Sequence, residues 1–168
     1  MQLNTVPHYD TSDNTTGCCP RFHPDGWDEQ TLHFKDKLFV RATTKSVMHV
    51  PVNMGAVFSR VQKAIGANDG FDPNNTLVLS RDLSAWEAEH LFAVVADVPG
   101  EEMVRVTGDF ITRVFEGPYS KAKHWVHEME VAAKAKGREA KRVFMFYTTC
   151  PRCAKAYGDN YVVGFAEI

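Results

Sequence analysis

Two pairs of cysteines are the residues of this chain whose type and spacing most directly suggest chemistry. Cys18 and Cys19 are adjacent near the beginning of the chain, and Cys150 and Cys153 form a C-x-x-C motif near its end. Two thiols at the C-x-x-C spacing can bind zinc or form a redox pair. A structural zinc ion takes four ligands, so the first pair could supply the remaining two sulfurs. No other cofactor is predicted.

Three interpretations of the cysteines stay open at this stage. Neighbouring side chains tend to diverge, so Cys18 and Cys19 are an unfavourable pair of ligands for one ion, and His23 could replace one of them. Alternatively, the thiols are redox-active or reactive, or they are inert. A thioredoxin-like site is disfavoured, because the residues after Cys153 run into a turn at positions 157–160 and predict no helix.

Aromatic residues form a second group of candidates. Their rings offer a large apolar contact area, and Tyr and Trp also keep a polar group. The alternative is core packing, above all for Trp125, which falls on the apolar stripe of a predicted helix. The candidate ligand-binding residues are Trp86, Tyr119, Trp125 and Tyr147, together with His49 at the end of a predicted strand.

Two carboxylates are the candidate catalytic residues. Glu87 follows Trp86 directly, and Glu116 ends a predicted strand just before a predicted helix. A carboxylate against an aromatic wall can have a raised pKa and then serve as a general acid or base. The alternative is a solvated or helix-capping carboxylate.

The elements that must position these residues follow from apolar periodicity. A helix over roughly 54–66 is indicated by apolar residues at Met54, Phe58, Val61 and Ile65, and a second helix runs from Gly117-Pro118 to Gly137. β-Branched and aromatic runs predict strands, and we expect the first of them to be interrupted near residues 35–37. The predicted strands cover residues 32–50, 76–80, 90–98, 103–116, 142–149 and 161–168.

Both halves of the chain therefore have the order strand, helix, strand, strand. A shift of about 64 residues places Val61 on Trp125 and Ile65 on Met129, so the repeat rests on pattern rather than on identities. We expect an α+β fold of two β-α-β-β repeats related by a pseudo-twofold axis. The sheet would be mostly antiparallel, with both main helices on one face and a central cleft for a ligand.

Residues 108–125 also carry a family resemblance. Gly108, Phe110, the triplet Gly117-Pro118-Tyr119 and Trp125 resemble the signature of the GyrI-like small-molecule-binding domain family, and the likeness extends over about residues 38–168. The resemblance implies two β-α-β-β repeats with a central cleft. Relatives include effector-binding domains of multidrug-responsive regulators, gyrase-inhibitory proteins, and stand-alone domains that hydrolyse reactive cyclopropane-bearing natural products.

Two departures from that family limit what carries over. Residues 1–37 are too short and irregular for a helix-turn-helix, so the domain would be a stand-alone member. Regulator relatives also use an acidic residue in the second repeat to bind cationic ligands. The corresponding strand here, RVFMFYTT at 142–149, contains no carboxylate.

Composition limits the class of protein. The chain has 168 residues and a formal net charge of −2 with scattered basic residues, which gives no electrostatic footprint for nucleic acid. It has no apolar run of about 18 residues and no secretory h-region, so we expect a cytoplasmic protein without a membrane span. We expect an irregular segment over 1–31, beginning with a loose tail to about residue 17, and one domain over 32–168. Its repeats would cover about 38–99 and 103–168.

The sequence thus predicts a protein that binds a hydrophobic small molecule in a cleft between two repeats, and the resemblance implies a detoxifying hydrolase of reactive natural products. Two alternatives stay open: a zinc- or thiol-based protein that uses the two cysteine pairs, and a protein-interaction module like the gyrase-inhibitory relatives. The sequence makes no prediction of the oligomeric state.

Overall fold

The structure is a computed structural model that describes all residues, 1–168. Seven strands, three α-helices and two short 3-10 helices follow one another along the chain. In chain order they are β1 (Thr31–Val47), β2 (Val50–Pro51), α1 (Met54–Ala67), η1 (Pro73–Asn75), β3 (Val78–Asp82), β4 (Glu87–Ala93), β5 (Glu102–Glu116), η2 (Tyr119–Lys121), α2 (Ala122–Ala135), β6 (Arg142–Tyr147), α3 (Pro151–Tyr157) and β7 (Tyr161–Glu167).

Six of the strands close into an antiparallel barrel. Their order is β1-β4-β3-β6-β7-β5, and β5 pairs back onto β1, while the short β2 pairs only with β1. The two longest strands make closure possible, because each pairs with one neighbour over its first part and with another over its second. The α+β class and the mostly antiparallel sheet are thereby confirmed.

Both halves of the chain have the same connectivity. In each half the first strand pairs with the third, β1 with β4 and β5 with β7, and the second pairs with the third, β3 with β4 and β6 with β7. A long helix follows the first strand each time. The predicted order of long strands and long helices is confirmed, with the unpredicted α3 added between β6 and β7, whereas a pseudo-twofold relation between the halves stays a prediction.

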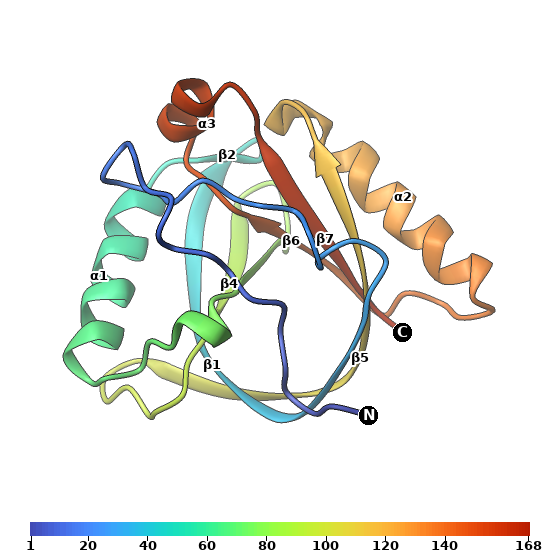
Figure 1. The fold of residues 1–168 in the computed structure, drawn as a ribbon, viewed down its shortest axis with the longest axis horizontal. Helices are drawn as coiled ribbons and strands as arrows, with labels where there is room; N and C mark the ends of the chain where they lie inside the picture. The colour runs from blue at the N-terminus through green and yellow to red at the C-terminus, as the bar shows by residue number, and fades with distance from the viewer.

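The two long helices flank the barrel on opposite sides (Figure 1). Helix α1 buries Val57, Val61 and Ile65 against β1 and β4, and α2 buries Trp125 and Met129 against β5, β6 and β7. These apolar stripes recur at helical spacing, which is why both helices were predictable. Because the sheet closes on itself, one outer face carries both helices.

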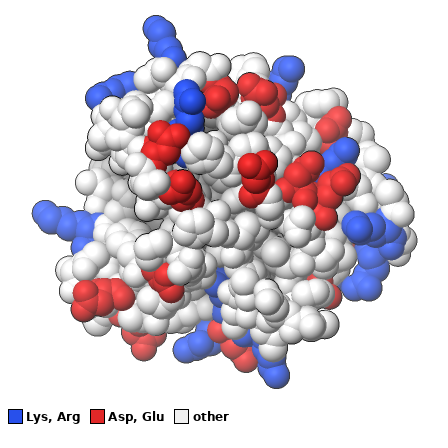
Figure 2. Space-filling model, viewed as in Figure 1, with Lys and Arg blue, Asp and Glu red and all other residues white.

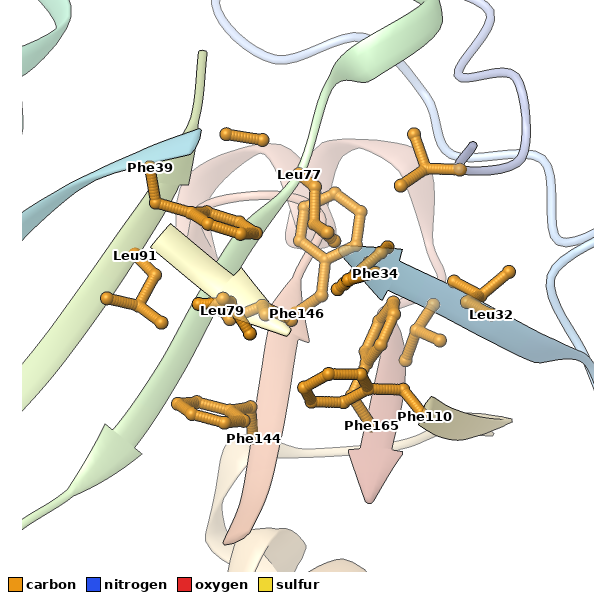
Figure 3. Packing of buried hydrophobic residues seen from close by; sticks show 14 of the residues in the cluster. Leu32, Phe34, Phe39, Leu77, Leu79, Leu91, Phe110, Phe144, Phe146 and Phe165 are labelled. Atoms are coloured by element: carbon orange, nitrogen blue, oxygen red, sulfur yellow. The ribbon is translucent and has the colours of Figure 1, made fainter. Parts of the chain in front are cut away.

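A cluster of 17 buried residues forms the main core of the barrel (Figure 3). Strand residues such as Phe39, Phe110 and Phe144 meet there, and the N-terminal segment adds four more. This segment runs across the front of the barrel in Figure 1. Its contributions are Val6, Tyr9, Phe22 and Trp27, the last with no exposed surface.

The prediction of a loose tail over residues 1–17 was therefore wrong. Val6 and Tyr9 are each about 95% buried, because the apolar core needs a cover that the strands alone do not supply. The expected packing of Phe22 and Trp27 onto the domain is confirmed, with their rings 5.5 Å apart.

Two element boundaries also differ from the predictions. The strand expected at 90–98 is β4, which runs from Glu87 to Ala93, and the apolar residues after it pack in a loop. The interruption expected near residues 35–37 is a register shift between Phe34 and Lys37, where Asp36 has φ +51°. A bulge of this kind adds one residue to a strand without ending it.

No helix of the structure is both long enough and apolar enough to cross a membrane. On the face drawn in Figure 2, acidic and basic side chains are scattered among larger uncharged areas.

Gly164 on β7 offers a test of the packing under α2. A Cβ atom there would lie 2.7 Å from Sδ of Met129 and 3.0 Å from Cε2 of Phe115, both of which are buried. We expect Gly164→Ala to lower the free energy of unfolding by about 1–3 kcal/mol through overpacking, measured by urea denaturation. Gly55→Ala in α1 is the control, because its Cβ meets nothing within 4 Å and alanine favours a helix. An equal loss in both variants would contradict this account.

Candidate metal centre

The structure brings all four cysteines together. Their four Sγ atoms lie within 4.8 Å of one another, and the Sγ atoms of Cys18 and Cys19 are 3.8 Å apart. All four are free thiols. In a tetrahedral zinc site, zinc–sulfur bonds of about 2.3 Å place the sulfurs about 3.8 Å apart. The cluster therefore has the donor set and nearly the spacing of a four-thiolate metal site.

A tight turn positions the first pair. Gly17 has φ +72°, a conformation that suits glycine, and the backbone N–H of Cys18 donates to Oγ1 of Thr16 at 3.3 Å. This turn directs the two adjacent thiols toward the same point. The expectation that neighbouring side chains diverge was wrong here, because it assumes an extended chain.

A short helix positions the second pair. Cys150 is the N-cap of α3, and Cys153 lies in its first turn. Residues three apart on a helix share a face, so both thiols point the same way. The sequence predicted no helix after the C-x-x-C motif, although its start and end signals are present: Pro151 at the first position and Gly158 in the left-handed conformation after the end. The seven-residue helix is too short to show a clear apolar period.

Other contacts hold the N-terminal segment against α3. The hydroxyl of Tyr157 donates to the carbonyl of Cys19, and its oxygen lies 3.3 Å from Oγ1 of Thr16. The guanidinium of Arg21 donates to the carbonyl of Tyr157 at 2.8 Å and lies 5.0 Å from the centre of its ring. Oγ1 of Thr16 is also 3.3 Å from Sγ of Cys153. Sequence reasoning missed these three residues, because without α3 nothing placed Tyr157 beside the cysteines.

The surroundings of the cluster shift the pKa values of two of its thiols in opposite directions. Hydrogen bonding from Thr16 lowers the pKa of Cys153 to about 6, whereas burial raises the pKa of Cys19. Four thiolates this close would repel one another strongly. A divalent cation would remove that repulsion, since a coordinated thiol is deprotonated.

Three of the predicted residues lie near this centre. The hydroxyl of Tyr119 donates to the carbonyl of Thr149, next to Cys150, at 2.6 Å. The rings of Tyr119 and Tyr147 are 5.8 Å apart. Glu116 and Tyr119 line the same open groove of about 500 Å³, which α3 borders with Pro151 and Lys155.

The remaining predicted residues lie elsewhere. His49 follows β1, where its Nδ1 is 2.8 Å from Oδ2 of Asp82, and its backbone N–H donates to the carbonyl of Ala85 beside Trp86. Trp86 is 56% exposed and precedes Glu87 at the start of β4. Trp125 is buried under α2 and stacks on Phe115 with the ring centres 5.6 Å apart, as the core-packing alternative describes.

Comparisons with known proteins identify a family. A family model described as bacterial hydrolase matches residues 9–168, a range that contains both cysteine pairs. A search of curated proteins found no match. Neither result supports the GyrI-like resemblance, which stays a prediction.

Tyr157 tests whether these contacts hold the segment without a metal. In reduced, metal-free protein we expect Tyr157→Phe to lower the free energy of unfolding by about 1–2 kcal/mol, since its hydroxyl contacts Cys19 and Thr16. Urea denaturation measures the effect. The control is Tyr161→Phe, which also removes a phenol hydroxyl, here from a ring whose centre lies 6.1 Å from that of Phe22. If both variants behaved alike, Tyr157 would not contribute to this contact.

Proposed function

Because the chain belongs to the bacterial hydrolase family, we propose that it is a hydrolase whose N-terminal segment is fastened to the barrel by one zinc ion. The observation that carries the zinc proposal is the convergence of four thiols within 4.8 Å from two distant parts of the chain. A set of four thiolates is typical of structural zinc, because it leaves no coordination position open for a substrate.

Zinc would act here on stability. When bound, the ion supplies attraction for four thiolates and so contributes to folding free energy. The chain's own residues do the rest: Thr16 and Tyr157 orient the two halves of the site, and Tyr9 connects the segment to the carbonyl of Thr148 at 3.0 Å. Cysteines that bind zinc instead of forming disulfides fit a reducing compartment, and we propose that the protein is cytoplasmic.

The groove beside α3 is our proposal for the hydrolytic site. Glu116 would accept a proton from a water molecule as general base, and Tyr119 would supply an apolar wall with a polar edge for a small hydrophobic substrate. Lys155 lines the same groove and offers a positive charge for a developing oxyanion. Asn160 also lines this groove, and its side-chain amide donates to the carbonyl of Gly117 at 2.8 Å.

This proposal moves the ligand away from the position expected from the sequence. A cleft on the axis between two repeats would need open space, whereas aromatic side chains occupy the main core. The common connectivity of the halves supports a pseudo-twofold relation and is compatible with the GyrI-like resemblance. Both remain proposals, and neither is needed for the groove.

Zinc binding can be measured directly by native mass spectrometry of reduced protein. We expect one zinc per chain in the wild type and none in the double variant Cys150→Ser, Cys153→Ser, because two thiolates cannot hold the ion tightly. His23→Ala is the control: its Nε2 is 3.0 Å from Oδ2 of Asp13, and it should keep the zinc. Wild-type protein that still carries no zinc after refolding in the presence of zinc would refute the proposal.

Glu116 can be tested with a panel of small hydrophobic chromogenic esters and amides. We expect Glu116→Gln to lower kcat/KM by about 100-fold or more, the usual loss when a general base is removed. The exposed Glu139→Gln serves as the control for a change of surface charge. Glu87→Gln tests the other candidate carboxylate, and a loss confined to that variant would place hydrolysis at the start of β4 instead of in the groove.

A further inference from the structure

A buried lysine lies outside both sites described above. Lys37 of β1 is 5% exposed and is the one lysine among the buried residues. The partners of its Nζ are a backbone carbonyl and a side-chain amide oxygen rather than a carboxylate. A buried ammonium without an anionic partner lowers the stability of a fold. A functional role would explain why a lysine occupies this position.

The bulge in β1 places this side chain. Phe34 and Phe39 both belong to the main core although they are an odd number of residues apart, which a regular strand would send to opposite faces. The register shift between Phe34 and Lys37 adds the residue that restores them to one face. Lys37, two residues before Phe39, shares that face, and its Nζ lies 5.4 Å and 5.9 Å from the centres of the two rings.

Two hydrogen bonds hold the amine in place. Nζ of Lys37 donates to the backbone carbonyl of Asn4 at 3.1 Å and to Oδ1 of Asn75, which is itself buried. A neutral amine has two N–H bonds, and these two acceptors use both of them. The lone pair on nitrogen is then free for an electrophile. An ammonium would instead carry a third N–H in need of a partner.

The lowered pKa of Lys37 also favours the neutral amine. Burial lowers the pKa of Lys37 to about 8, against the opposing attraction of Asp72. A substantial fraction of the amine is therefore neutral near pH 8, whereas an exposed lysine is almost wholly protonated there. Neutral, desolvated lysines are the ones that act as nucleophiles toward carbonyl groups.

Lys37 is one of the residues that line a polar pocket of about 670 Å³, and both hydrogen-bond partners of its amine, Asn4 and Asn75, line it too. Three carboxylates line it, Asp36, Asp72 and Asp97, against one other cation, Arg105, so the pocket favours neutral or cationic ligands. Asn4 and Thr5 of the N-terminal segment form one side. None of its lining residues belongs to the groove beside α3.

We propose that Lys37 is a reactive amine that forms an imine with a small, polar, uncharged aldehyde or ketone bound in this pocket. The lone pair of Nζ adds to the carbonyl carbon, and the electrons of the C=O π bond move to oxygen. A proton then passes from nitrogen to that oxygen. Loss of one water molecule leaves the C=N bond, and addition of water reverses the step. This activity is separate from the proposed hydrolysis at Glu116 and does not depend on it.

The test compares two neighbouring lysines in the same protein. Wild-type protein is incubated at about pH 8 with glyceraldehyde and cyanoborohydride, which reduces an imine to a stable secondary amine, and labelling is followed by peptide mapping. We expect Lys37 to be labelled about tenfold faster than the exposed Lys35, because its neutral fraction is far larger. Equal or slower labelling of Lys37 would overturn the proposal and leave the amine as a structural donor.

Two further measurements define the ligand and the residue. Glyoxylate, an anionic aldehyde, should label Lys37 more slowly relative to Lys35 than glyceraldehyde does, and the reverse order would overturn the uncharged ligand class. Lys37→Arg keeps hydrogen-bond donors at this position but cannot form an imine, so it should lose the fast-labelling phase, whereas Lys35→Arg should keep it. A fast phase that survives in Lys37→Arg protein would assign the reaction to another lysine.

Discussion

The apolar core of the closed barrel is the constraint on which the rest of this structure depends. Closing the sheet turns one face of six strands inward, and the residues on that face are large: Phe34, Phe39, Phe110, Phe144 and Phe165. Such a cluster is stable only if water is kept from it on all sides. The chain meets this need with its first 30 residues, which place the fully buried Trp27 and three other apolar side chains against the strands. An irregular segment without a helix or long strand thereby becomes part of the core.

A cover of irregular structure must be attached to the barrel, and two of the three proposed sites, the metal centre and the lysine pocket, lie at its attachment points. A segment without regular structure makes few backbone hydrogen bonds of its own, so it needs attachment points. One is the cysteine cluster with Tyr157 and Thr16, at α3. Another is Asn4, whose side chain exchanges hydrogen bonds with the backbone of Lys35 at the bulge and whose carbonyl accepts from Lys37. The metal centre and the lysine pocket therefore both include residues of the N-terminal segment that covers the core.

Sequence reasoning succeeded where local patterns are long. The stripes of α1 and α2 follow from periodicity over a dozen or more residues, and β-branched and aromatic runs indicated the strands of each half and the interruption in β1. It failed where the signal is short or nonlocal. Helix α3 has only seven residues, and the burial of Val6 and Tyr9 depends on a barrel that no local pattern announces. The meeting of Cys18 with Cys150 was open for the same reason, since a pairing across 132 positions needs the fold before it can be judged.

The residues of the candidate sites also divide into those that local sequence patterns predict and those that only the fold reveals. Glu116 was selected for its place at a strand end and Tyr119 for its aromatic ring, and they share a groove because η2 connects β5 directly to α2. Lys37 was missed because a lysine in a strand ordinarily faces solvent. The bulge reverses this orientation: two core phenylalanines five positions apart require an added residue between them, and that residue decides which face of the strand Lys37 takes. The same parity test on other strands would find buried charges that composition and charge counts overlook.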